Sequence, residues 1–99
     1  MKIHVSNDAA DWYKQELHLK NGDYIRFFAR YGGHSTIQQG YSLGLSNEEP
    51  QTIGVKEEKS GITYYVEDKD LWYFDDQDLY VDYNTTLNEP EFRCSRCAK

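Results

Sequence analysis

The N-terminal stretch has a pattern of apolar positions that predicts a short β-strand and then one α-helix. Ile3 and Val5 alternate with polar residues, which is the period of a strand. Ser6 is a good helix N-cap, and the residues after it place apolar side chains at helical spacing. These apolar positions are Ala9, Ala10, Tyr13 and Leu17. We expect the helix to end near residues 20–22, where Gly22 can adopt the left-handed conformation that closes many helices.

After this helix, apolar residues recur at every second position, which predicts strands. The alternation is present in DYIRFFARY (23–31), GYSLGLS (40–46) and DLYVDY (78–83). Two further segments, QTIGVKE (51–57) and GITYYVED (61–68), flank the turn-rich link EKSG and predict a hairpin.

These elements predict an α+β fold in which one N-terminal helix packs on a compact, mostly antiparallel β-sandwich or flattened barrel. The 99 residues suffice for one domain with one modest core. From Asn84 onward the period fades, so we expect residues 1–83 to form the domain and residues 84–99 to form a flexible tail that carries a Cys-x-x-Cys motif.

The charge argues against a nucleic-acid-binding protein. The formal net charge is −6 and the isoelectric point is about 4.9, whereas affinity for phosphate backbones comes from clustered Lys and Arg. Residues 64–83 hold seven acidic residues and one lysine, and so carry the whole of this net charge. Because that segment contains no EF-hand loop, we interpret it as a solvated acidic surface rather than a calcium site.

The sequence shows neither a signal peptide nor an apolar run long enough for a membrane span. We therefore expect a cytoplasmic protein without a membrane partner. In that reducing compartment two cysteines three residues apart are metal ligands, redox groups or free thiols rather than a structural disulfide.

Three side chains are candidates for metal binding. His34 follows Gly32-Gly33 in RYGGHST, where glycines favour a turn that presents the imidazole to solvent. Cys94 and Cys97 form a Cys-x-x-Cys pair, a half-site for zinc or iron. The plain alternative for His34 is a solvated loop residue. For the cysteines it is a thiol reductant or a zinc binder, since Arg93 and Arg96 should lower the thiol pKa.

Catalytic motifs are missing from the sequence. It has no G-x-S-x-G, no P-loop, no H-E-x-x-H and no dinucleotide-binding fingerprint. We therefore expect a protein that is not an enzyme.

Four segments in this order resemble the HesB-like family of A-type iron–sulfur cluster carriers. They are SNDAADWYKQEL, YIRFFARYGGHS, GYSLGL and VEDKDLWYFDDQDLYVDY, and the resemblance covers residues 1–83. It is strongest to a small Gram-positive subgroup described as iron–sulfur biosynthesis proteins. The resemblance implies a compact β-rich domain with one helix that often dimerises. Family members hold iron or an iron–sulfur cluster with three cysteines, one after the glycine turn and two in a C-terminal Cys-Gly-Cys.

Carried over by position, the first family cysteine falls on His34, and the C-terminal pair falls on Cys94 and Cys97. This chain therefore departs from the family at one ligand and in the spacing of the other two. Imidazole replaces thiolate as an iron ligand in Rieske centres, so the changed set is still compatible with iron.

The first hypothesis is an iron–sulfur cluster assembly or carrier protein that binds iron or a cluster transiently through His34, Cys94 and Cys97. Its partners would be the assembly machinery, apo client proteins and a second copy of the chain. The alternative is a metal-free protein-interaction module of the same fold, which uses the aromatic and acidic surface around residues 72–76.

Overall fold

The computed structural model describes residues 1–31, 41–74 and 77–94. Its elements in chain order are β1 (Ile3–Val5), α1 (Asn7–Glu16), β2 (Tyr24–Tyr31), β3 (Tyr41–Ser46), β4 (Ile53–Lys59), β5 (Ile62–Glu67), a 3₁₀ turn η1 (Asp68–Asp70), α2 (Leu71–Phe74), β6 (Leu79–Asn84) and β7 (Glu89–Cys94). None of the helices in these ranges is long and apolar enough to span a bilayer.

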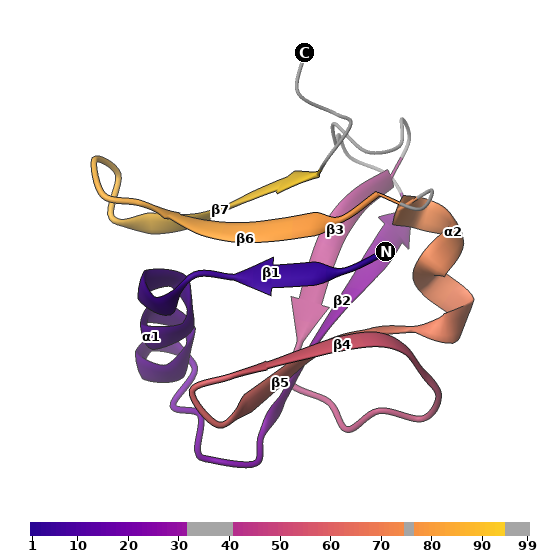
Figure 1. Cartoon of the computed structure of the whole chain (residues 1–99), viewed down its shortest axis with the longest axis horizontal. Helices are drawn as coiled ribbons and strands as arrows, with labels where there is room; N and C mark the ends of the chain where they lie inside the picture. The colour runs from indigo at the N-terminus through magenta and orange to yellow at the C-terminus, as the bar shows by residue number, and fades with distance from the viewer. Residues whose placement is uncertain (32–40, 75–76, 95–99) are drawn as a thin grey trace.

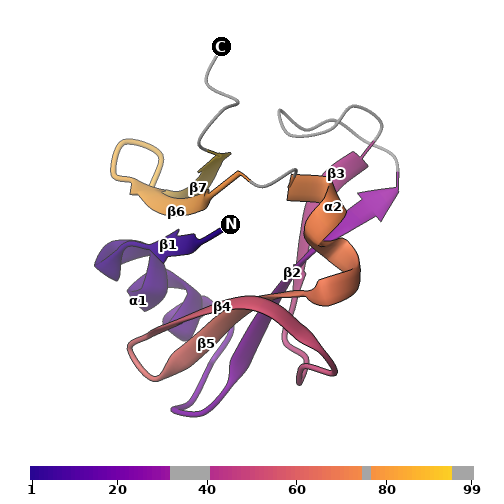
Figure 2. The same cartoon turned by 45° about the vertical axis from the view of Figure 1, so that its right-hand side comes forward.

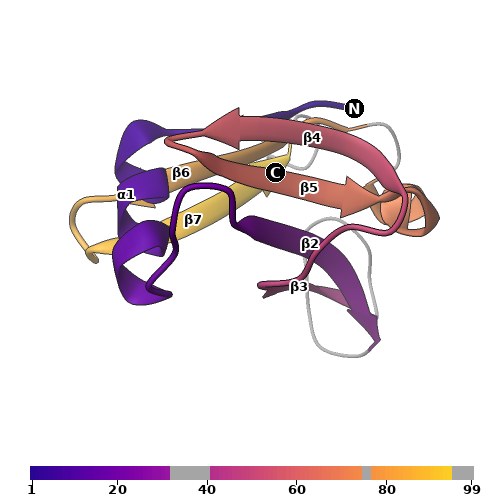
Figure 3. The same cartoon turned by 90° about the horizontal axis from the view of Figure 1, so that it is seen from below.

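The strands form two mixed sheets. A three-stranded sheet has the order β1-β6-β7, and a four-stranded sheet has the order β3-β2-β5-β4. The pairs β1–β6 and β2–β5 are parallel, and the other three pairs are antiparallel. Figure 2 shows the three-stranded sheet above the β4–β5 hairpin, and Figure 3 shows the four strands of the other sheet side by side.

The prediction of an α+β fold with an N-terminal helix is confirmed, but one of its details needs correction. Within the described residues no backbone ladder joins the two sheets, so the alternative of a flattened barrel is wrong. Most strand pairs are antiparallel, as predicted, but each sheet also contains one parallel pair, so both sheets are mixed. Parallel neighbours are joined by long crossovers, and alternation within a strand does not reveal which strand lies beside it.

The core lies between the two sheets. The inner face of the three-stranded sheet contributes Ile3, Val5, Leu79 and Val81, and the inner face of the other sheet contributes Ile25, Phe27, Ile62, Tyr64 and Val66. The Phe27 ring is stacked on Tyr64, with 6.1 Å between centroids, and meets the edge of Phe92 across the sheets at 5.8 Å. Full burial of one such side chain contributes roughly 1.5–3 kcal/mol.

Helix α1 begins at the predicted N-cap but ends earlier than predicted. The Ser6 hydroxyl accepts a hydrogen bond from the Ala9 amide at 3.1 Å. At the other end His18 has a φ of 53°, and the amides of His18 and Leu19 donate to the carbonyls of Gln15 and Lys14. This is a Schellman motif with histidine in the place that glycine usually takes. Leu19 is consequently buried, whereas Leu17, expected on the buried face, is 38% exposed.

The predicted β4–β5 hairpin is confirmed. Its two-residue turn consists of Ser60 and Gly61, which both have positive φ values of 54° and 82°. Turns of this class match the twist of the flanking strands. A Cβ atom on Gly61 would lie 2.5 Å from Asn21 Oδ1. A larger residue at this position is therefore disfavoured both by the positive φ and by this close contact.

The C-terminal part of the fold differs from the sequence prediction. Residues 89–94 form β7, which pairs with β6 from Asn84↔Glu89 to Leu79↔Cys94. The predicted flexible tail is therefore wrong for residues 84–94. Strand β7 does alternate, but Pro90 obscures the pattern, and proline is tolerated because β7 is an edge strand. Residues 95–99 lie outside the described residues, and for them the flexible tail stays a prediction.

A loop over residues 47–52 lies against the outer face of the four-stranded sheet. The Tyr65 hydroxyl donates to the Glu48 carbonyl at 2.9 Å. The backbone amides of Gln51 and Thr52 donate to the Glu67 carboxylate at 2.8 and 3.0 Å. These two hydrogen bonds hold the pKa of Glu67 below its usual value, because they stabilise the charged form.

Replacement of Gly61 by alanine should destabilise the protein by roughly 1–2 kcal/mol, because Ala resists the left-handed conformation and its Cβ meets Asn21. The free energy of unfolding in urea measures this effect. Ser60→Ala is the matched control, since both residues carry a Cβ at the same positive φ, and it should change stability by less than about 0.5 kcal/mol. Equal losses in both variants would contradict this account of the turn.

Stability should decline in acid partly because of Glu67. Its pKa is lower in the folded state than the value of about 4.3 for an unfolded chain. The stabilising contribution is therefore complete above pH 4.3 and is lost as pH falls through the folded-state pKa. Glu67→Gln should lower the urea midpoint at pH 7, and the gap to the native chain should shrink toward pH 3. Glu49→Gln, at an exposed loop position, should leave a constant gap; a similar pH trend there would refute the role of Glu67.

Candidate functional site

The structure leaves the predicted ligand set largely untested. His34 and Cys97 lie outside the described residues. Cys94 is the last residue of β7, and its backbone lies opposite Leu79. Among the residues that the structure describes, no group of three or more His, Cys, Asp or Glu side chains is arranged to hold a metal ion. The convergence of His34, Cys94 and Cys97 therefore stays a prediction.

The elements that lead toward the predicted ligands end on one side of the fold. Strand β2 ends and β3 begins at the paired residues Tyr31 and Tyr41, and β7 ends at Cys94. In the views of Figures 1 and 2 these three strand ends all lie toward the upper side of the molecule. The topology thus directs the segment before His34 and the strand with Cys94 to the same end.

A stacked row of polar and aromatic side chains fixes β7 just before Cys94. His4, Tyr80 and Arg93 stand in register on β1, β6 and β7. The His4 ring stacks on Tyr80 with 4.6 Å between centroids, and the Arg93 guanidinium lies 4.4 Å from the Tyr80 centroid. Only the strand register brings these three residues together, so this row cannot be predicted from local periodicity.

The residue at each end of this row contacts a carboxylate. His4 Nε2 lies 3.3 Å from Asp78 Oδ2, and Arg93 Nε donates to Asp82 Oδ2 at 2.8 Å. The pKa of Asp78 is lowered first by the hydrogen bond to His4 and then by the backbone amide of Lys2.

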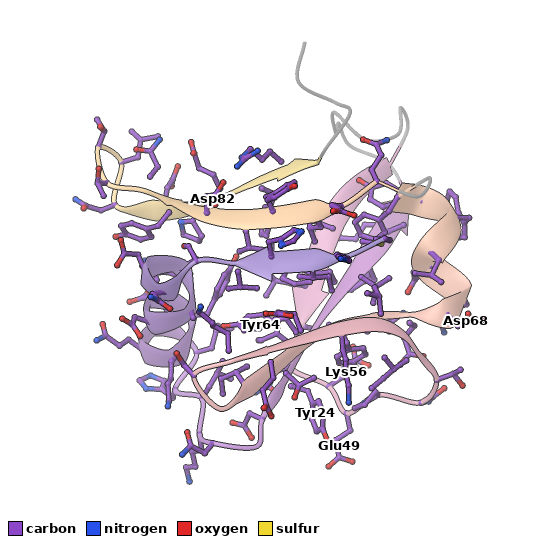
Figure 4. The ribbon with its side chains drawn as sticks, in the orientation of Figure 1. Tyr24, Glu49, Lys56, Tyr64, Asp68 and Asp82 are labelled. Carbon is purple, nitrogen blue, oxygen red and sulfur yellow. The ribbon has the colours of Figure 1, made fainter. Side chains whose placement is uncertain are left out.

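The acidic segment is not the solvated surface that its composition indicates. Glu67 binds two backbone amides, and Asp70 receives the Arg26 Nη2 donor at 2.8 Å. Both side chains are buried, with relative exposures of 4% and 9%. Together with Asp78 and Asp82, four of the seven acids bind cations or backbone amides in the fold. Asp75 and Asp76 lie outside the described residues, and Asp68 is exposed at the periphery (Figure 4).

The aromatic residues of α2 divide between core and surface. Tyr73 and Phe74 are fully buried and belong to the core. Trp72 is 52% exposed. The metal-free alternative uses a surface around residues 72–76, and of the three aromatic residues there only Trp72 is exposed.

Comparisons with known proteins identify the relatives of this chain. The family model described as iron-sulphur cluster biosynthesis matches residues 1–95. A Bacillus subtilis protein named pyruvate dehydrogenase inhibitor is 50% identical over 93% of this chain and 97% of its own length. An uncharacterized protein of Staphylococcus saprophyticus is 40% identical over 90% of this chain and 94% of its own.

A third relative, an uncharacterized protein of Staphylococcus haemolyticus, is 36% identical over 83% of this chain and 86% of its own length. No solved structure matches the chain significantly. The family match confirms the resemblance noted from the sequence, and it extends beyond residue 83 to include β7. It supports a general role in iron–sulfur cluster biosynthesis, and the chain belongs to the HesB-like iron-sulphur cluster biosynthesis family.

Proposed function

We propose that this chain is a non-enzymatic regulator that binds pyruvate dehydrogenase and lowers its activity without needing a metal. The observation that carries the proposal is the 50% identity, over nearly the full length of both chains, to the protein named pyruvate dehydrogenase inhibitor. This is the metal-free interaction module considered from the sequence, with a partner now assigned to it.

The changed ligand set supports a role that does not depend on iron. The family resemblance implies three cysteines, whereas this chain has His34 in the first position and a wider spacing between Cys94 and Cys97. A fold can keep its shape while its site takes on another function. The fold also exposes Trp72, at 52%, and tryptophan is among the residues that contribute most of the binding energy at interfaces.

A second candidate function is the iron–sulfur carrier. It is favoured by the shared direction of the ends of β2, β3 and β7, which lead to His34 and Cys94. In this function iron or a cluster is the cargo, held by His34, Cys94 and Cys97 and passed to an apo client by ligand exchange. A dimer would supply a second ligand set, and the partners would be the assembly machinery and client proteins. Both candidate functions are cytoplasmic ones.

The regulator proposal predicts inhibition without iron. Purified, metal-free protein should reduce NADH formation by the Bacillus subtilis pyruvate dehydrogenase complex at least several-fold when it is present in molar excess. A variant with His34→Ala, Cys94→Ser and Cys97→Ser should inhibit as strongly as the native chain. Absence of inhibition by the native chain, or its loss in this variant, would refute the proposal.

The carrier function predicts iron-dependent colour. After anaerobic reconstitution with iron and sulfide, the native chain should show charge-transfer absorption in the visible region and bound iron. His34→Ala should lose most of this absorption, and Cys94→Ser with Cys97→Ser should lose all of it. A colourless native protein without iron would exclude the carrier. Stoichiometric zinc that depends only on the two cysteines would indicate a zinc binder instead.

A further inference from the structure

A pocket lies between α1 and the end of β6. Four residues of α1, Asp8, Asp11, Trp12 and Gln15, line it together with Tyr83 of β6, and its volume is about 230 Å³. The helical residues are spaced i, i+3, i+4 and i+7, so they lie on one face. Figures 1 and 2 show that the β6–β7 hairpin passes above this helix. The pocket is thus formed by two elements that are far apart in the sequence.

The two carboxylates of the pocket differ from those of Glu67, Asp70, Asp78 and Asp82, which have partners in the fold. Asp8 and Asp11 are exposed, and neither forms a hydrogen bond or ion pair through its side chain within the described part of the chain. The nearest cation on the helix is engaged elsewhere, because Lys14 Nζ donates to Asn21 Oδ1 at 2.9 Å and to the Ser60 carbonyl at 3.2 Å. The pocket therefore carries negative charge that the fold does not neutralise.

Two aromatic side chains supply the apolar part of the pocket. Trp12 and Tyr83 are partly buried and pack against the core, which holds their rings in place. Trp12 also contacts the buried ring of Tyr13, with 5.2 Å between centroids. A cation within about 6 Å of such a ring is attracted to its face, and a planar guanidinium can stack on it as well.

A buried hydroxyl lies close to the acidic part of the pocket. Tyr64 is fully buried in the interior (Figure 4), and its hydroxyl has no hydrogen-bond partner among the described residues. Its ring meets Tyr13 of α1 with 6.3 Å between centroids. Burial raises the pKa of Tyr64 to about 12, and the negative charge of Asp11 adds to this effect because it disfavours the ionised phenol. Asp11 is thus close enough to this buried polar group to influence it.

We propose that the pocket of Asp8, Asp11, Trp12, Gln15 and Tyr83 receives an arginine side chain of the partner protein. Two unpaired carboxylates match the donors of a guanidinium, the rings match its plane, and Gln15 offers an additional acceptor. This inference rests on the proposed function for the identity of the partner, pyruvate dehydrogenase. Recognition of arginine by the pocket does not depend on it.

The pocket can be tested by titrating the protein with N-acetyl-arginine amide in about 150 mM salt, the physiological ionic strength, while the NMR signals of the tryptophan indole N–H groups are monitored. The Trp12 signal should shift saturably, while the signal of Trp72, which lies on α2, should stay in place. N-acetyl-citrulline amide, a neutral molecule of the same shape, should cause no saturable shift. Asp8→Asn with Asp11→Asn should weaken arginine binding at least fivefold.

The matched control is Glu57→Gln with Glu58→Gln, which changes the net charge equally at two exposed positions of β4. It should bind the arginine probe like the native chain. A missing Trp12 shift, an equal response to citrulline, or an equal loss of binding in the control would overturn the arginine pocket. Circular dichroism of each variant establishes that α1 remains folded.

The inhibition assay separates this inference from the proposed function. If both hold, Asp8→Asn with Asp11→Asn should inhibit pyruvate dehydrogenase at least tenfold less strongly than the native chain, and the control should inhibit equally. Full inhibition by the pocket variant would overturn the pocket as the contact with the enzyme while the proposed function stands. Probe binding by a native chain that does not inhibit would refute the proposed function and leave the arginine pocket.

Discussion

A continuous row of aromatic rings through the core holds the helix and the two sheets together. Tyr13 of α1 meets Tyr64 of β5, Tyr64 is stacked with Phe27 of β2, and Phe27 meets Phe92 of β7. This row connects the helix, the four-stranded sheet and the three-stranded sheet, which share no backbone ladder within the described residues. A small chain cannot bury much surface, so a few large rings carry most of the packing. Phe92 is the last ring of this row, and its contact with Phe27 packs β7 against the core of the domain.

Charged side chains form a second set of contacts between the elements of the fold. Carboxylates from one short segment bind the 47–52 loop, the guanidinium of Arg26, the histidine of β1 and the arginine of β7. Exposed ion pairs contribute little individually, but these contacts add to the attachment between different elements of the fold. The two aspartates of α1 have no such partner within the described residues, and the aromatic rings of Trp12 and Tyr83 lie beside them in the pocket.

The sequence predicts single elements of this fold well and their arrangement poorly. Strands β2, β3, β5 and β6, the Ser6 cap and the Ser60-Gly61 turn follow from local periodicity and turn chemistry. The end of α1 was misplaced because His18 adopts a conformation that glycine normally takes. Helix α2 has only four residues, too few for a helical period. The order of strands, and with it the row of His4, Tyr80 and Arg93, depends on contacts between distant segments.

The candidate ligands illustrate the same division. His34 and Cys94 could be chosen from residue type and position, but whether they meet depends on the two ends of strands that no local pattern relates. The pocket on α1 could have been found in part, since Asp8, Asp11, Trp12 and Gln15 share a helical face. Tyr83 could not, because it comes from a strand whose distance to the helix only the fold defines.

The composition of β7 has a consequence for how two copies of the chain can meet. Strand β7 pairs with β6 on one side, and its other edge would be the natural place to continue the sheet into a second molecule. Pro90 removes a donor from that edge, and Glu89 and Glu91 on either side would bring like charges together. Addition of β7 to β7 is thereby disfavoured. A homodimer of this chain would therefore not continue the three-stranded sheet by pairing two β7 edges.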